Sequence, residues 1–141
     1  MATFNKFNIF VENLAEKVHN LGADTLKIML TNTTPVAGNA VKADVTEIAA
    51  ANGYLAGGLP ATIVASAQTS GTYKLTLGDV VFTAAGGAIG PFRYAVLYND
   101  TPTSPADPLI GWYDYGSSIT LLDTETLTVD FDATNGVLTL G

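Results

Sequence analysis

The sequence contains no cysteine and only one histidine, and charged residues make up 13% of its 141 positions. The absence of cysteine excludes disulfides, thiolate metal sites and a cysteine nucleophile. The charged fraction is about half of what a soluble globular domain usually carries. Since apolar residues reach 48% of the chain, we expect a weakly solvated surface that suits burial against neighbouring molecules.

Basic residues are scarce, and none follows position 93. Residues 1–93 hold all six basic side chains together with six acidic ones, so this part of the chain is neutral. The other acids have no basic residue among them: Asp100, Asp107, Asp114, Asp123, Glu125, Asp130 and Asp132. This balance argues against nucleic-acid binding, which needs Lys and Arg to neutralise phosphates. It leaves either a solvated acidic face or a patch that meets a basic partner.

Long hydrophobic runs are also missing. No run approaches the roughly 20 apolar residues of a membrane helix, and charged residues interrupt the first twenty positions, so we expect no signal peptide and no membrane partner. We expect a protein that is made in a cytoplasm and stays soluble or assembles there. The length favours a single domain over residues 1–141.

The N-terminal segment has the period of a helix and predicts an amphipathic helix over about 4–21. Phe10 widens its apolar stripe, whereas Ile9 falls on the opposite, polar face. His19 also falls on the polar face, and we interpret it as a solvated residue at the helix end, because no partner is placed locally to make it a general base. The stripe itself recurs every three or four residues, at Phe4, Phe7, Val11, Leu14, Val18 and Leu21.

After Gly22 the period changes to two, and short strands follow from about residue 25 to 140. Residues 44–51 are an exception that predicts a short helix. Residues 92–98 are apolar on both faces and predict a central strand, in which Arg93 needs a carboxylate partner. Asn135-Gly136 predicts a two-residue hairpin turn between the last two strands. About eight strands at this spacing predict an all-β fold, a two-sheet β-sandwich or a barrel, with the N-terminal helix over one end or edge.

No arrangement of residues points clearly to catalysis. Asp130 and Asp132 share a strand face and can in principle bind calcium or flank a glycosidic bond. Their alternation with apolar residues instead favours a solvated strand face. The glycine pairs lack the Lys-Ser/Thr tail of a phosphate-binding loop. We therefore predict no enzymatic activity, no cofactor and no metal site.

The aromatic residues of the second half leave carbohydrate binding open as an alternative. They can form a platform on which sugars stack, although aromatics at strand spacing more often pack in a core. The residues concerned are Tyr94, Tyr98, Trp112, Tyr113 and Tyr115.

Three blocks of sequence resemble small structural proteins of tailed bacteriophages, and the similarity extends over essentially the whole chain: residues 2–7, residues 44–54 followed by 57–58, and residues 92–100 combined with 109–116. The resemblance implies a head decoration, or cement, protein with a jelly-roll sandwich. Such proteins bind the outer surface of the capsid as homo-oligomers, here a homo-dimer or homo-trimer, and bridge neighbouring major capsid proteins.

The resemblance supplies no residue motif for the capsid contact. From the helical stripe and its exposed neighbour we expect an oligomer or capsid contact at Phe4, Phe7, Ile9 and Phe10. A receptor- or carbohydrate-binding module of a phage tail or fibre is the main alternative. A tail-tube or connector subunit is a second alternative.

Overall fold

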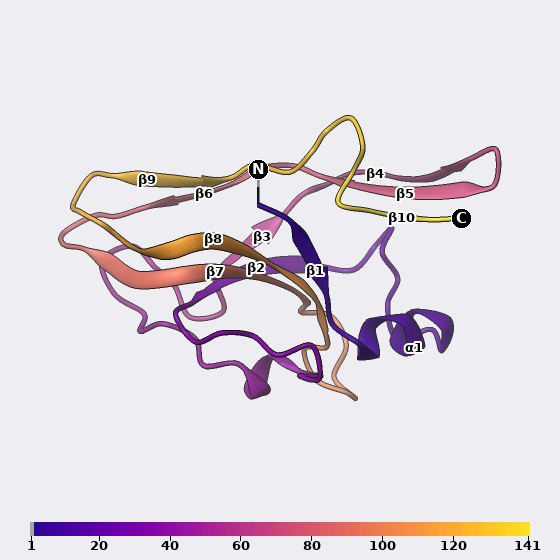
Figure 1. Ribbon diagram of the computed structural model, residues 1–141, viewed down its shortest axis with the longest axis horizontal. Coiled ribbons are helices and arrows are strands. Elements are labelled where there is room, and N and C mark those ends of the chain that lie inside the picture. The colour runs from indigo at the N-terminus through magenta and orange to yellow at the C-terminus, as the bar shows by residue number, and fades with distance from the viewer. Residues whose placement is uncertain (1) are drawn as a thin grey trace.

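The computed structural model describes residues 2–141, which form ten strands and two short helices (Figure 1). In chain order these are β1 (Phe4–Lys6), α1 (Ile9–Ala15), β2 (Leu26–Thr31), the 3-10 helix η1 (Lys42–Asp44), β3 (Leu59–Ala61), β4 (Ile63–Thr69), β5 (Thr72–Leu77), β6 (Val80–Thr83), β7 (Ile89–Asn99), β8 (Leu109–Leu121), β9 (Thr126–Val129) and β10 (Leu138–Leu140).

The strands form three antiparallel sheets, so the chain is mostly β as predicted. The largest sheet has the order β1-β8-β7-β2-β3, and the two smaller sheets are β10-β5-β4 and β6-β9. Figure 1 shows both smaller sheets lying over one face of the five-stranded sheet. The described residues thus hold ten strands in three sheets, where the sequence predicted about eight strands in two.

The main hydrophobic core lies between the five-stranded sheet and the two smaller ones. Ile28 and Leu97 from the large sheet belong to the same buried cluster as Leu75 of β5 and Phe82 of β6. These four side chains are at most 1% exposed. Burial of aliphatic and aromatic side chains on this scale supplies most of the driving force for folding.

Strand β7 is a central strand, which confirms the prediction for residues 92–98. It pairs with β2 on one side and β8 on the other. Its side chains are buried on both faces, because Leu97 faces the main core while Val96 belongs to a second buried cluster with Phe7 and Met29. Arg93 also has its predicted carboxylate partner, with its Nε 2.8 Å from Asp114 Oδ1.

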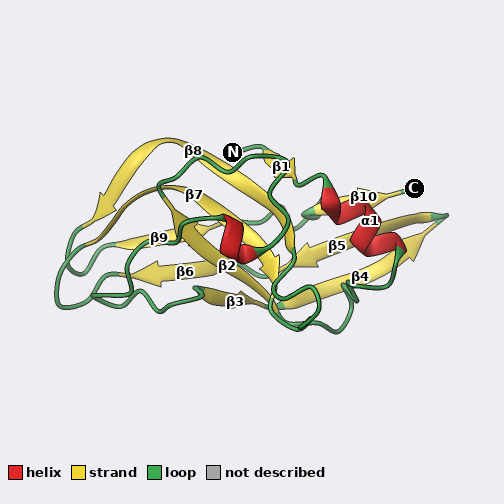
Figure 2. Cartoon of the chain, turned by 90° about the horizontal axis from the view of Figure 1, so that it is seen from below, coloured by secondary structure: helices red, strands yellow, loops and turns green. Residues whose placement is uncertain are grey.

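The second face of the five-stranded sheet is covered by the loop over residues 32–58, which Figure 2 shows crossing the sheet together with η1. The predicted helix over 44–51 is wrong, because Val45 already has extended backbone angles. The loop instead forms hydrogen bonds with the part of β2 that is not paired with β3. The Ile48 amide donates to the Leu30 carbonyl (3.1 Å) and the Leu30 amide donates to the Tyr54 hydroxyl (3.0 Å).

The predicted N-terminal helix over 4–21 is also wrong in extent, since α1 covers only Ile9–Ala15. Residues 4–6 form β1 instead and pair with β8, where Phe4 lies opposite Tyr113. Gly111 makes this pairing possible, because a Cβ there would lie 2.3 Å from the Phe4 ring. The helix ends well before Gly22, at a turn in which Lys17 has a φ of 69°.

The predicted hairpin at Asn135-Gly136 does not pair its two flanking strands with each other. β9 pairs with β6, and β10 pairs with β5. Because β6 directly follows β5 along the chain, these two strands offer separate partners to β9 and β10. The turn between β9 and β10 is stabilised by Asp132, whose Oδ1 accepts a hydrogen bond from the Asn135 amide at 2.8 Å.

Candidate contact surfaces

The four residues predicted to make an oligomer or capsid contact do not form one exposed patch. Phe7 is fully buried against Trp112, with ring centroids 4.6 Å apart, and Phe10 is 4% exposed. Phe4 is half-buried against Tyr113, and Ile9 is half-buried on α1. Only Phe4 and Ile9 therefore keep surface that a partner can reach, and the contact remains a proposal for these two.

The aromatic residues considered as a sugar platform lie on opposite faces of the five-stranded sheet. Tyr98 and Trp112 belong with the cluster under the loop. Tyr113 packs on the other face against Phe131, at 5.9 Å between ring centroids. Tyr115 follows it on β8 with 60% of its surface exposed. Because successive side chains of a strand alternate between faces, Trp112 and Tyr98 cannot stack on the same ligand as Tyr113 and Tyr115.

His19 is buried, so its interpretation as a solvated helix-end residue is wrong. It is 5% exposed. Its Nδ1 lies 3.1 Å from Nδ2 of Asn99, and that amide also donates to Asp24 Oδ2 at 2.7 Å. Nε2 is buried without a hydrogen-bond partner in the described part of the chain. The helical period predicted the wrong exposure for His19 because α1 ends at Ala15, so residue 19 does not follow the helical pattern.

The environment keeps His19 neutral at pH 7. Burial lowers the pKa of the imidazole from 6.5 to about 4, and the nearby Asp24 carboxylate only partly opposes that effect. The side chain within hydrogen-bond distance of Nδ1 is the Asn99 amide, which neither takes up nor releases a proton in this pH range, and Phe10 packs against the ring. The cluster is therefore a structural anchor between residues 19–24 and the end of β7, without the pairing that a general base needs.

The acidic pair Asp130 and Asp132 does not converge on a common point. Asp130 is exposed just beyond β9, whereas Asp132 caps its turn. Hydrogen bonds from Asn135 and Thr134 stabilise the Asp132 carboxylate and lower its pKa. Within residues 2–141 there is no group of three or more His, Asp or Glu side chains placed to hold a metal ion.

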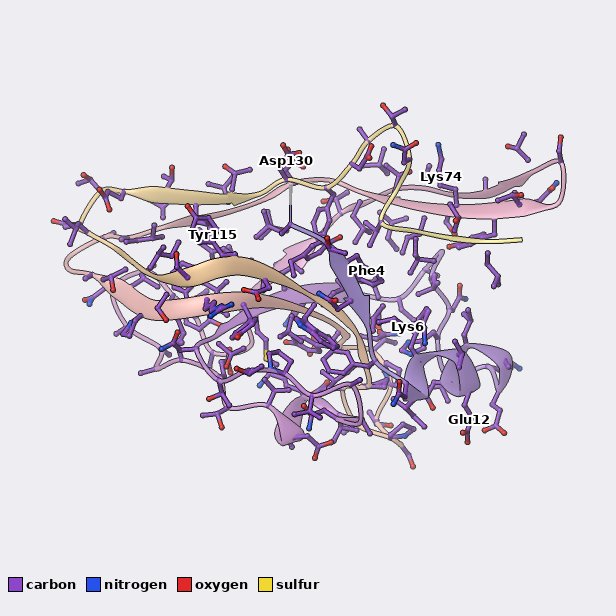
Figure 3. The ribbon with its side chains drawn as sticks, viewed as in Figure 1. Phe4, Lys6, Glu12, Lys74, Tyr115 and Asp130 are labelled. Atoms are coloured by element: carbon purple, nitrogen blue, oxygen red, sulfur yellow. The ribbon has the colours of Figure 1, made fainter. Side chains whose placement is uncertain are left out.

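A groove of about 390 Å³ opens between β7 and β8 on one side and β9 on the other. Phe92, Tyr113 and Leu127 make much of its lining apolar. In Figure 3, Tyr115 and Asp130, which also line it, come from the two different layers. A wider depression of about 930 Å³ lies beside the C-terminal end of α1, near His19. Neither hollow gathers the converging polar groups that a specific small-molecule site requires.

Large apolar side chains are exposed on many different elements of the chain. They lie on α1, in loops, and on β4, β6, β8 and β10, with 48% to 64% of their surface exposed. Such residues are common singly, but this set is unusual on a chain with so little charge. The residues are Val11, Val36, Leu55, Val64, Val81, Tyr115, Leu122 and Leu140.

Comparison with protein-family models, with curated proteins and with solved structures found no match to this chain. Among residues 2–141, none of the helices is long and apolar enough to span a membrane.

Proposed function

We propose that this chain is a structural virion protein that decorates and reinforces a bacteriophage capsid. It would bridge subunits of the major capsid protein on the outer surface of the shell, as a homo-dimer or homo-trimer. The observation that carries the proposal is the set of large apolar side chains exposed on several elements of a weakly charged chain. A surface of this kind favours contact with more than one neighbour. The resemblance of the three sequence blocks to phage structural proteins supports the same function.

The mechanism is additive burial of surface. Each copy spans a seam between capsid subunits, and the buried area must be exposed again before internal pressure can separate them. A specific contact typically buries about 800 Å² on each partner. Repetition over the shell adds avidity that a single contact lacks. Because the binding is shared among many contacts, each contact can be weak while the whole shell gains resistance to heat.

The finer description of the fold belongs to the same proposal. We propose a jelly-roll sandwich, with the five-stranded sheet as one layer and the two smaller sheets together as the other. The continuity of β5 with β6 supports this grouping, since the two strands are separated only by residues 78–79. The carbohydrate-binding alternative has less in its favour, because the five aromatic side chains are divided between two faces and only Tyr94, Tyr113 and Tyr115 line a common groove.

The experiment that tests the function is binding to purified phage capsids that lack the protein. We expect saturable co-sedimentation, regularly spaced density on the outer shell in electron microscopy, and a higher temperature of capsid disruption. Serine substitutions at Val36, Leu55 and Leu122, made one at a time, identify the contact. Each should change the free energy of unfolding by no more than about 0.5 kcal/mol, as surface changes usually do, and at least one should weaken capsid binding.

The contrary result is also clear. If no shell binding occurs at concentrations well above those in an infected cell, and the protein is found on tails or on glycans instead, the capsid proposal is wrong. A glycan array read with a Tyr115→Ala variant, which removes an exposed ring of the groove, then distinguishes sugar recognition from a tail-tube role.

A further inference from the structure

The edges of the sheets differ in how well they are protected from pairing with another chain. Edge strands expose unpaired backbone N–H and C=O groups, and proteins commonly protect them with proline, charge or short length. β3 has only three residues and contains Pro60, and β1 also has three. β4 is the longest of the edge strands in residues 2–141, with seven residues and neither proline nor charge.

Strand β4 is also accessible along its length. Figure 2 shows it at the outer edge of its sheet, and every residue after Ile63 except Ser66 is exposed. A bulge between Ile63 and Ala65 disturbs only its first residues, and Ala65–Thr69 pair regularly with β5. The hairpin turn that follows has positive φ at Ser70 and Gly71, as a tight two-residue hairpin requires. The edge is therefore regular over Ala65–Thr69 and exposed at each of these residues except Ser66, whose side chain lies near Gly22.

Charge explains why a second copy of this chain is the partner that fits. The chain carries a net charge of −7, so two copies repel each other over most of their surface. Residues 48–73 contain no charged side chain, and this is the longest uncharged stretch of the sequence. β4 lies within it. Two copies that meet along β4 thus place their least repulsive surfaces together.

We infer that two copies of this chain pair edge to edge through β4, antiparallel, about a two-fold axis at Ser66. Ala65 of one copy then lies opposite Ala67 of the other, and the two β10-β5-β4 sheets become one continuous six-stranded sheet. Small side chains at this centre let the strands approach without steric conflict. The inference rests on the proposed function only for the role of the dimer, because the pairing itself belongs to the isolated protein.

The expected affinity is modest. A single seven-residue edge buries less than the roughly 800 Å² per partner of a standard interface. We therefore expect dissociation in the micromolar range, about 10⁻⁶ to 10⁻⁴ M. Sedimentation velocity over that range should show conversion of monomer to dimer as concentration rises.

A pair of double variants tests both the surface and the register. Ala65 and Ala67 share the outer face of the hairpin with Lys74, which Figure 3 shows extending from that side. In Ala65→Glu/Ala67→Glu the new acids of the two copies lie opposite each other, so dimerisation should weaken at least tenfold. In Ala65→Lys/Ala67→Glu opposite charges meet instead, and dimerisation should match or exceed that of the unchanged protein. The variants differ only at position 65, and both place an acid opposite Lys74 within the chain.

The outcomes separate cleanly once circular dichroism shows that both variants fold. Loss of the dimer in the first variant and its recovery in the second support the pairing. A chain that stays monomeric up to 10⁻⁴ M, about the weak limit expected for this edge, overturns it. So does a first variant that dimerises normally, or a second variant that fails to dimerise. Capsid binding by the unchanged protein is measured separately, so failure of the pairing and failure of the proposed function give different results.

Discussion

One face of the five-stranded sheet is covered by other strands, whereas the opposite face is covered by the loop over residues 32–58. Under the strands lie Ile28 and Leu97, in a cluster built with β5 and β6. Under the loop lie Met29 and Val96, in a smaller cluster with Phe7. Side chains that are neighbours in the sequence thus belong to two different kinds of interior.

The two covers satisfy their backbone polar groups in different ways. The strands pair with each other, so their hydrogen bonds do not depend on particular side chains. The loop depends on a few. Glu47 accepts from the Tyr54 hydroxyl (2.7 Å) and the Gly57 amide (2.6 Å), and Lys42 lies 3.1 Å from its other oxygen. The comparison shows that a loop can seal a sheet face when side chains supply the partners that a ladder would otherwise give.

The largest expected effect comes from removing neighbouring core side chains on the two faces. Ile28 and Met29 are adjacent in β2 and both are 0% exposed. Alanine at either position should cost about 2–5 kcal/mol of unfolding free energy. We expect Ile28→Ala to be more damaging than Met29→Ala, because packed strands fill a cavity less readily than a loop does. Denaturant unfolding of the two variants measures this difference, and a larger loss for Met29→Ala would contradict it.

A pH titration tests how much stability comes from a contact outside the two covers. This contact is made by His19, which anchors residues 19–24 to Asn99. The unfolded chain binds a proton at this residue near pH 6.5, whereas the folded chain binds it only near pH 4. Stability is therefore complete above about 6.5 and falls as the pH drops toward 4. The full loss is about 3 kcal/mol for a shift of this size.

A variant that cannot titrate isolates this effect from the acidic residues, which also bind protons near pH 4. In His19→Gln the slope of unfolding free energy against pH between 4 and 6.5 should decrease by the amount that corresponds to one bound proton. Equal slopes in the two proteins would show that His19 stays accessible to protonation in the fold.

Elements specified by their own composition could be predicted from the sequence. Residues 92–98 are apolar on both faces, which is sufficient to identify a central strand and the need of Arg93 for an acid. The N-terminal segment failed for a physical reason. Phenylalanines spaced by three serve a strand, a turn and a short helix as well as one long helix, and the choice depends on a partner more than 100 residues away. Gly111 is the residue of the partner strand β8 that points to this arrangement, but it can be interpreted only when the pairing of β1 with β8 is known.

The candidate surfaces were less predictable than the fold, because they also depend on contacts between residues far apart in the sequence. Alternation along β8 correctly implies that Trp112 and Tyr113 point in opposite directions, so the division of the aromatics was available in the sequence. The burial of His19 was not, because it depends on where α1 ends and on Asn99 at the far end of β7. Likewise, the open edge of β4 becomes visible only when the order of the strands is known.

The smallest expected effect tests the loop cover directly at Glu47, whose side chain is 16% exposed. Glu47→Ala leaves the Tyr54 hydroxyl and the Gly57 amide without their acceptor, which should cost about 2 kcal/mol of unfolding free energy. Glu47→Gln keeps an oxygen in place and loses only the charge near Lys42, so it should cost less than half as much. Amide hydrogen exchange gives the decisive measurement. If the comparison is right, Gly57 and Leu30 lose protection in Glu47→Ala while the β5 amides keep theirs, because β5 is held by its backbone bonds to β4 and β10 even though the Tyr54 ring packs on Phe82 in the main core. Equal loss on both faces would show that the covers unfold as one unit.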